Sequence, residues 1–424
     1  MDIAALRREN RYLRRAVDEL SFLNELSGTI GSLFNSKEIM QMIIKKSIRS
    51  IHAEQGAIIL VDEEGDQEMK TLVRSMISYG SRKPFSLHQS LLGWMHINKK
   101  PISIADPHKD EQFPEIGWDK SLRTIACVPL IVKSKLTGIL SVFNKREGRE
   151  FTVEDLRLLS IIASQSAQVV ENARLYEEEQ ALMKLQEEAR LAREIQINLL
   201  PKSAPDVPGY DIAGKSVPAF SVGGDYYDFI TTDEDKIAVC LGDISGKGMP
   251  AAMLMSNLQA TIRSQALVSG AVHACICSSN KLLFQSTDIN KYATCFYGNL
   301  DIRKNEFCYT NAGHNPPVLF KKTSKPILLK TGGPVLGFID NLDYKDETVS
   351  FDPGDMCVIY SDGITEAMDT LENEFGEKKL KALIKENLDL SSGEIIEKII
   401  EAVNKHSRGV PQSDDITVVV IKRI

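Results

Sequence analysis

Residues 237–248, Ile-Ala-Val-Cys-Leu-Gly-Asp-Ile-Ser-Gly-Lys-Gly, decide how the C-terminal half of this chain folds. The first five residues are apolar and partly β-branched, which predicts a buried strand. Asp243 follows at the end of that strand, and Gly242 lets the backbone approach or turn tightly beside the carboxylate. A carboxylate at the end of a buried strand indicates a functional site.

Other aspartates occupy similar places in separate glycine-bearing motifs. They are Asp225 in residues 223–228, Asp362 after the apolar run 357–360, and Asp414 with Asp415 before the run 416–420. Gathering such carboxylates is costly unless something positive lies between them. Hard divalent cations with oxygen ligands and several waters are the usual solution. The pattern therefore predicts a two-metal hydrolytic site.

Composition limits the class of protein. The 424 residues suggest two domains with connectors, and 43% hydrophobic with 7% aromatic residues suits a globular chain. A net charge of −7 argues against a nucleic-acid binder. Seven cysteines form no CxxC pair, so no disulfide framework is expected. We find no signal peptide and no apolar run of about 18 residues, so we expect a cytoplasmic protein without a membrane segment.

The N-terminus predicts a coiled coil over residues 1–21. Apolar residues recur at alternating spacings of three and four, and Asn10 and Asn24 fall at a positions. An Asn at an a position favours a parallel two-stranded coil, so a parallel homodimer is expected. The alternative is an amphipathic helix packed on its own domain.

Residues 22–172 predict an α+β domain with an antiparallel sheet. The expected elements are a helix over 36–51, strands over 55–61, 102–104, 124–132 and 136–143, and a long helix from Thr152. Residues 127–145, CVPLIVKSKLTGILSVFNK, and 151–176, FTVEDLRLLSIIASQSAQVVENARLY, resemble the second half of a GAF domain.

The GAF resemblance leaves the ligand of this domain open. Cyclic-nucleotide-binding members carry an Asn-Lys…Phe…Asp-Glu signature, and this chain has Asn144, Lys145, Phe151 and Asp155 but Leu156 where the Glu belongs. This departure puts cyclic-nucleotide binding in doubt. The resemblance is consistent either with an unidentified small-molecule ligand or with a purely dimerising role.

Residues 173–200 predict a helical coiled-coil linker. Leu175, Leu182, Leu185, Ala189, Ala192, Gln196 and Leu199 lie near one seam. Pro201 and Pro205 then end the helix. A coil entering and another leaving the GAF-like domain suits a dimeric signal transmitter.

The catalytic half, residues 201–424, contains one misleading motif. Residues 209–216, Gly-Tyr-Asp-Ile-Ala-Gly-Lys-Ser, match the P-loop pattern of nucleotide-binding proteins. A working P-loop needs a strand before it and a helix after it. Pro205 and Pro208 precede the motif and Pro218 follows, while residues 210–217 alternate like a strand.

The ordered motifs of this half resemble the metal-dependent protein phosphatase (PPM) family in its bacterial SpoIIE-type branch. They are residues 223–228 (GGDYYD), 242–248 (GDISGKG), 311–317 (NAGHNPP), 361–366 (SDGITE) and 414–417 (DDIT). The resemblance implies an α/β/β/α sandwich that follows the GAF-like domain and the coiled-coil helix.

The resemblance also implies roles for particular residues. Asp243 would bridge two Mn²⁺ or Mg²⁺ ions, with the Ile244 carbonyl on one of them, and Asp225 would hold a water of the metal shell. Asp362 and Asp414 would complete the second ion's ligands, with Asp415 as the alternative to Asp414. Gly224, Gly242 and Gly363 would let the backbone approach these carboxylates.

The general acid and the phosphate clamp stay unassigned. Ser245 stands where eukaryotic members have a His, and residues 218–222 lack the phosphate-binding Arg. His314 is either a general acid or the brace of a turn, and Asp228 is either an outer-shell partner or a strand-end residue. Lys247 either attracts the substrate phosphate or is solvated surface.

Together these features predict a GAF-regulated protein serine/threonine phosphatase of bacterial signalling. The resemblance implies a phosphorylated STAS-type anti-sigma factor antagonist as substrate, hydrolysed by attack of metal-activated water. One alternative is a pseudophosphatase that binds a partner without chemistry. Another is a nucleotide-dependent enzyme that uses residues 209–216.

Overall fold

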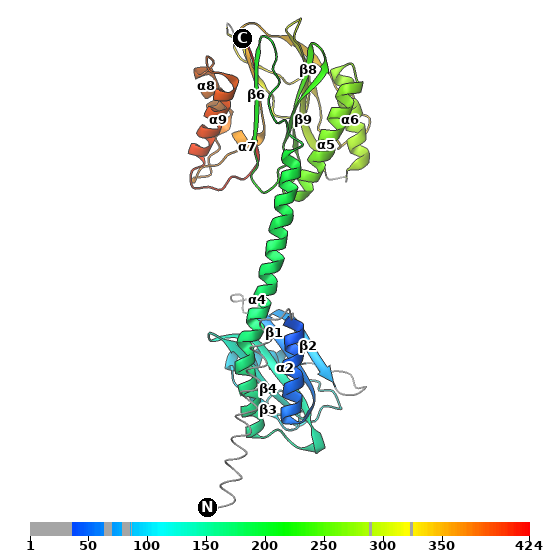
Figure 1. Ribbon diagram of the computed structural model, residues 1–424, viewed down its shortest axis with the longest axis vertical. Coiled ribbons are helices and arrows are strands. Elements are labelled where there is room, and N and C mark those ends of the chain that lie inside the picture. The colour runs from blue at the N-terminus through cyan, green and yellow to red at the C-terminus, as the bar shows by residue number, and fades with distance from the viewer. Residues whose placement is uncertain (1–35, 63–69, 79–84, 86, 288–290, 323–324) are drawn as a thin grey trace, which may run out of the picture. The chain divides into compact units, whose positions relative to one another are not determined.

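The computed structural model describes residues 36–62, 70–78, 85, 87–287, 291–322 and 325–424 (Figure 1). The chain divides into two compact units, Met1–Lys184 and Leu185–Ile424. The coiled coil expected over residues 1–21 lies outside the described residues. No helix in the described part of the chain is both long and apolar enough to cross a bilayer.

The first unit is built on an antiparallel sheet with strand order β2-β1-β5-β4-β3. Its strands are β1 Ala53–Asp62, β2 Lys70–Ser78, β3 Ile102–Ile104, β4 Ile125–Val132 and β5 Lys135–Lys145. Its helices are α2 Ser36–Ile51, α3 Gln89–Asn98, the short 3₁₀ helix η1 Arg146–Gly148, and the first part of α4 Val153–Ile197.

Residue periodicity explains this sheet and its covering helices. Ile58 and Leu60 of β1 face the core formed with α2 and α4, whereas Ala57, Ile59 and Val61 face the core on the α3 side. Alternate residues of a strand point to opposite faces, so the run 57–61 of β1 is apolar on both faces. The expected helix 36–51 and the expected strands are confirmed, whereas β2 and α3 were not expected.

The second unit contains two facing sheets. One has the order β13-β10-β9-β8-β7 with β14 paired to β10, and the other has the order β12-β11-β15-β16-β6. The strands are β6 Tyr210–Val217, β7 Tyr226–Asp233, β8 Lys236–Ile244, β9 Ala293–Asp301, β10 Glu306–Ala312, β11 Val318–Phe320, β12 Ile327–Leu328, β13 Gly332–Gly333, β14 Glu347–Ser350, β15 Met356–Tyr360 and β16 Ile416–Arg423. The helices are α5 Met249–Val268, α6 Val272–Ser286, α7 Asp362–Thr365, α8 Gly376–Glu386 and α9 Ser392–His406.

The layers of this unit form an α/β/β/α sandwich, which confirms the expected architecture. Helices α5 and α6 cover the sheet of β8, and α8 and α9 cover the sheet of β6 (Figure 1). The core between the sheets contains Val239, Phe296, Ile359 and Val419. Because both faces of each sheet are covered, central strands such as β8, β15 and β16 are apolar over most of their length.

Helix α4 departs from the expected linker at its end. It runs without interruption from Val153 to Ile197, before Pro201. Leu182 and Leu185 on the predicted seam are 57% and 63% exposed. Gln196, which the sequence placed on the same seam, is only 9% exposed and contacts the second unit's own backbone. The seam therefore ends before Gln196.

Candidate active site

Strand pairing places the first two aspartates side by side. Tyr226, directly after Asp225, pairs with Gly242, directly before Asp243, where β7 and β8 lie antiparallel. The two faces of this sheet pack into different cores, and a shift of the pairing by one residue would move every side chain of a strand to the other core. Two residues far apart in the sequence thus meet at one end of the sheet.

The facing sheet brings Asp362 and Asp414 to a common end. Tyr360 of β15 pairs with Val418 of β16, so the residues after β15 and before β16 are adjacent. The Ser361 hydroxyl donates to the Asp415 carbonyl at 3.0 Å, and the Thr417 N–H donates to Ser361 Oγ at 2.9 Å. These bonds join the start of α7 to the loop before β16.

The aspartates influence one another's protonation across the sheets. Burial, followed by the charges of Asp243 and Asp415, raises the pKa of Asp225 well above its ordinary value. Burial, followed by Asp362 and Asp414, raises the pKa of Asp243 to about 7. Burial and then Asp414 raise the pKa of Asp362. Such mutual repulsion among carboxylates that share one site indicates a place for a cation.

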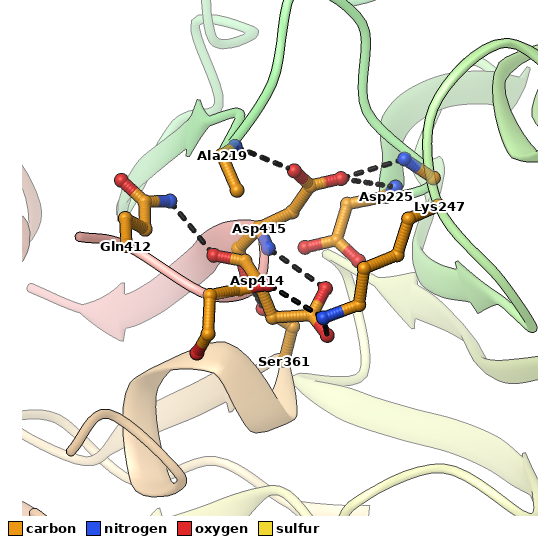
Figure 2. A network of polar contacts seen from close by, with 9 residues as sticks. Ala219, Asp225, Lys247, Ser361, Gln412, Asp414 and Asp415 are labelled. Carbon is orange, nitrogen blue, oxygen red and sulfur yellow. Dashed lines mark hydrogen bonds and ion pairs between the residues drawn. The ribbon is translucent and has the colours of Figure 1, made fainter. Parts of the chain in front are cut away.

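Asp415 has a different role from Asp414 (Figure 2). Asp415 Oδ1 accepts from the Ala219 N–H at 2.8 Å, and Oδ2 accepts from the N–H groups of Gly224 at 2.6 Å and Asp225 at 3.2 Å. Both of its oxygens are thus engaged by the segment before β7. Asp414 is half-buried, and its Oδ2 lies 3.0 Å from Lys247 Nζ.

Lys247 places a positive charge beside these carboxylates. Its Nζ donates to the Ser413 carbonyl at 2.5 Å in addition to pairing with Asp414, and its charge lowers the pKa of Asp362. The sequence suggested either a phosphate contact or solvated surface for this lysine. In the structure it partly neutralises the acidic cluster.

His314 is buried behind the site. Its ring Nδ1 lies 2.8 Å from Thr294 Oγ1, and its backbone N–H donates to Asn311 Oδ1 at 2.7 Å. Thr294 pairs with Asp243 across β9 and β8. Burial lowers the pKa of His314 to about 4, so its ring is neutral near pH 7. A neutral, enclosed imidazole suits a brace for the Asp243 strand better than a general acid.

Asp228 fastens β7 to α5. Its carboxylate is 0% exposed, pairs with the Arg263 guanidinium at 2.5 Å, and accepts from the Tyr226 hydroxyl at 2.6 Å. Sequence reasoning missed Arg263, since no local pattern links it to a strand that begins 37 residues earlier at Tyr226. Asp228 therefore holds the helix that follows residues 244–248.

Close backbone approach explains two of the glycines. A Cβ on Gly363 would lie 2.1 Å from the Asp415 carbonyl oxygen, and one on Gly242 would lie 2.7 Å from Leu258 Cδ2. At Gly224 the nearest atom, the Ile244 carbonyl oxygen, would be 3.3 Å away, so this position is less strictly constrained.

The chemistry of this donor set fits hard divalent cations. Asp225 Oδ2 is buried without a hydrogen-bond partner among the described residues, so it is available as a ligand. Within those same residues, no three Asp, Glu, His or Cys side chains are gathered closely enough to hold an ion unaided. Mg²⁺ keeps several waters and needs only one or two carboxylates, so an open arrangement is compatible with it.

The P-loop-like stretch does not form a nucleotide site. Residues 210–217 are strand β6, paired along β16, and Lys215 Nζ pairs with Glu397 at 2.6 Å. In the described part of the chain, the next element after β6 is the strand β7 and not a helix. A phosphate cradle needs a helix N-terminus, which is missing at this point of the chain.

The GAF-type signature residues form internal contacts. Asn144 Oδ1 accepts from the Arg123 N–H at 2.7 Å, and Asn144 Nδ2 donates to the Ser121 carbonyl at 3.0 Å. Lys145 pairs with Asp155. These contacts join β5 to the start of α4 and to the loop before β4.

Comparison with known proteins agrees with this geometry. Residues 233–424 match the family model described as Stage II sporulation protein E (SpoIIE), and residues 35–171 match a GAF domain model. The chain is 33% identical over 256 residues to phosphoserine phosphatase RsbU of Bacillus subtilis, covering 58% of this chain and 75% of that protein. It is 30% identical over 263 residues to protein IcfG of Synechocystis, covering 56% of this chain but only 41% of that protein.

A solved structure supports the fold of the second unit. The SiaA-PP2C domain of Pseudomonas aeruginosa matches 57% of this chain and 98% of its own chain, with a TM-score of 0.50 and 19% identity. With an N-terminal GAF domain and a complete sandwich that carries the aspartate motifs, the chain belongs to the SpoIIE-type family of PP2C-like phosphatases and is a protein serine/threonine phosphatase.

Proposed function

We propose that this phosphatase uses two Mn²⁺ or Mg²⁺ ions held by Asp225, Asp243, Asp362 and Asp414, with the Ile244 carbonyl as a further ligand. The observation that carries this proposal is the convergence of those four carboxylates from both sheets, with mutually raised pKa values at three of them. The sequence left Asp415 as the alternative to Asp414 as a metal ligand. Its hydrogen bonds to the backbone of residues 219–225 favour instead a structural role in holding that segment.

The chain's residues position the reaction and do not form a covalent intermediate. When bound, the two ions supply the activated water and neutralise the charge that develops on the phosphoryl group. Asp225 is buried, and its unpartnered oxygen would orient groups in the metal shell. Burial raises the pKa of Cys240 and Cys357, so neither thiol is suited to nucleophilic attack.

Family membership supports a proposal for the substrate and for the regulation. We infer that the substrate is a phosphorylated STAS-type protein in a cytoplasmic partner-switching cascade. The GAF domain, through an unidentified ligand or through dimerisation, would regulate the phosphatase unit. The exposed apolar residues of α4 support a parallel homodimer.

The test is turnover by the full chain with Mn²⁺, on a phosphorylated STAS-type protein and on p-nitrophenyl phosphate. Asp243→Asn is expected to abolish turnover of both substrates. Asp389→Asn, at an exposed aspartate between α8 and α9, is the matched control and should retain it. Chelator should silence the wild type. Turnover that survives both chelator and Asp243→Asn would overturn the metal mechanism.

A further inference from the structure

Gln196 makes an unusual contact at the end of α4. Its Nε2 donates to the Gly223 carbonyl at 2.6 Å, and its Oε1 accepts from the Gly223 N–H at 2.9 Å. The two ends of the side-chain amide therefore pair with both backbone groups of one residue. All four atoms are buried, so neither backbone group has ready access to water.

Gly223 lies two residues before Asp225, in the segment that Asp415 holds from its other side. Asp415 binds the N–H groups of Ala219, Gly224 and Asp225. A Cβ on Gly223 would lie 2.4 Å from Asp415 Oδ2, so this segment is confined between Gln196 and Asp415. The backbone of Asp225 is thus fixed by two side chains from distant parts of the sequence.

We propose that Gln196 is a positioning residue for the metal site, acting through Gly223 to hold the Asp225 carboxylate in place. This inference rests on the metal site proposed above. Asp225 Oδ2 has no partner among the described residues, so side-chain hydrogen bonds at that oxygen do not hold the carboxylate. The hydroxyls of Ser361 and Thr417 hydrogen-bond the carboxylate. Its place depends further on its own backbone, which Asp415 holds directly and the Gln196 amide holds through Gly223.

A simpler reading is that Gln196 only anchors the end of α4. Gln259 of α5 offers a control for it, since its Nε2 donates to the Leu199 carbonyl at 3.4 Å, close to the same end of α4. Among the described residues, the hydrogen bond of Gln259 goes to Leu199 and not to residues 219–225. A variant at Gln259 therefore perturbs the anchoring of α4 without releasing Gly223.

The experiment compares Mn²⁺ binding to the full chain by titration for wild type, Gln196→Met and Gln259→Met. Met keeps the length of Gln but has no amide. We expect Gln196→Met to weaken Mn²⁺ binding about tenfold or more, and Gln259→Met to leave it within about twofold. Hydrogen exchange of peptides covering residues 219–225 should accelerate in Gln196→Met alone.

Gln196→Asn keeps the amide but is one methylene too short to reach both Gly223 groups. It should show the same loss, and it serves as the test if Gln196→Met is unfolded by circular dichroism. A folded Gln196 variant that binds Mn²⁺ with wild-type affinity and shows wild-type hydrogen exchange over residues 219–225 would overturn the inference. Failure of the wild type itself to bind Mn²⁺ would instead overturn the proposed metal site.

Discussion

At the scale of single residues, neighbours decide what each carboxylate does. Asp414 and Asp415 are adjacent in sequence, yet Asp415 accepts three backbone N–H groups while Asp414 lies beside Lys247. A carboxylate whose two oxygens accept three N–H bonds has few lone pairs left and hence little capacity for a cation. The half-buried Asp414 keeps that capacity.

The raised pKa of Asp243 predicts a pH-dependent stability for the metal-free protein. Its folded value of about 7 exceeds its ordinary value of 3.8, so the folded state binds more protons between these values. The stability due to Asp243 is therefore present below about pH 4 and is lost as pH rises through about 7.

Asp243→Asn should remove this dependence. We expect urea unfolding in chelator to show that the free energy of unfolding of the variant rises relative to that of the wild type between about pH 5 and pH 8. The relative gain is on the order of 2 kcal/mol. Mn²⁺ should stabilise the wild type more than the variant. Parallel pH curves for the two proteins would contradict the repulsion among these carboxylates.

His314 gives a second residue-scale prediction. Because burial holds its pKa at about 4, the ring is already neutral throughout the neutral range. His314→Gln should lower kcat by less than about tenfold and leave the shape of the pH–rate profile unchanged, whereas loss of a general acid costs about 10²-fold or more. Loss of the alkaline limb in this variant would restore His314 as the acid.

At the scale of elements, close packing between loop and helix sets the geometry of the site. Helix α7 begins at Asp362 and passes directly against the backbone of the loop before β16, with Gly363 at the point of contact. Ser361 bonds both sides of this junction. The two aspartates of this sheet are therefore positioned together.

Gly363→Ala tests this junction. Its Cβ would lie 2.1 Å from the Asp415 carbonyl oxygen, so backbone must move and activity should fall by about 100-fold or more, with a lower Tm. Gly393→Ala in α9 is the control, since a Cβ there has no atom within 4 Å. It should be neutral or slightly stabilising, because Ala has the higher helix propensity. Equal behaviour of the two variants would refute the role of Gly363.

At the scale of the whole molecule, α4 is shared between the two units and presents apolar side chains to solvent. Leu175, Leu182 and Leu185 are 49%, 57% and 63% exposed. Apolar residues at these heptad-related positions are costly unless a partner helix covers them. This exposure is the structural ground for the proposed homodimer.

The dimer is tested by light scattering of the full chain. Leu182→Lys combined with Leu185→Lys should weaken dimerisation at least about tenfold, since it places like charges in the seam. Lys184→Gln, on the same turn, is the control and should leave the mass unchanged. A monomeric wild type, or a double variant with unaltered mass at every concentration, would contradict the proposal.

Local patterns in the sequence were enough to predict the class of each half and the aspartate set. Short runs rich in β-branched residues, such as 237–241 and 416–420, predict buried strands, and each has its aspartate beside one end. The expected helix 36–51 and the strand over 210–217 are present for the same reason. Strand β2 was missed because its residues 70–78 mix apolar with polar side chains.

Which polar groups meet depends on long-range packing. The spacing of Gln196 places it on the heptad seam of α4, yet its amide binds Gly223. Arg263 of α5 likewise binds Asp228 of β7. Such pairings depend on how helices pack on sheets, which no local pattern encodes. Periodicity tells which face of an element is buried, but the partner buried against it is chosen by the fold as a whole.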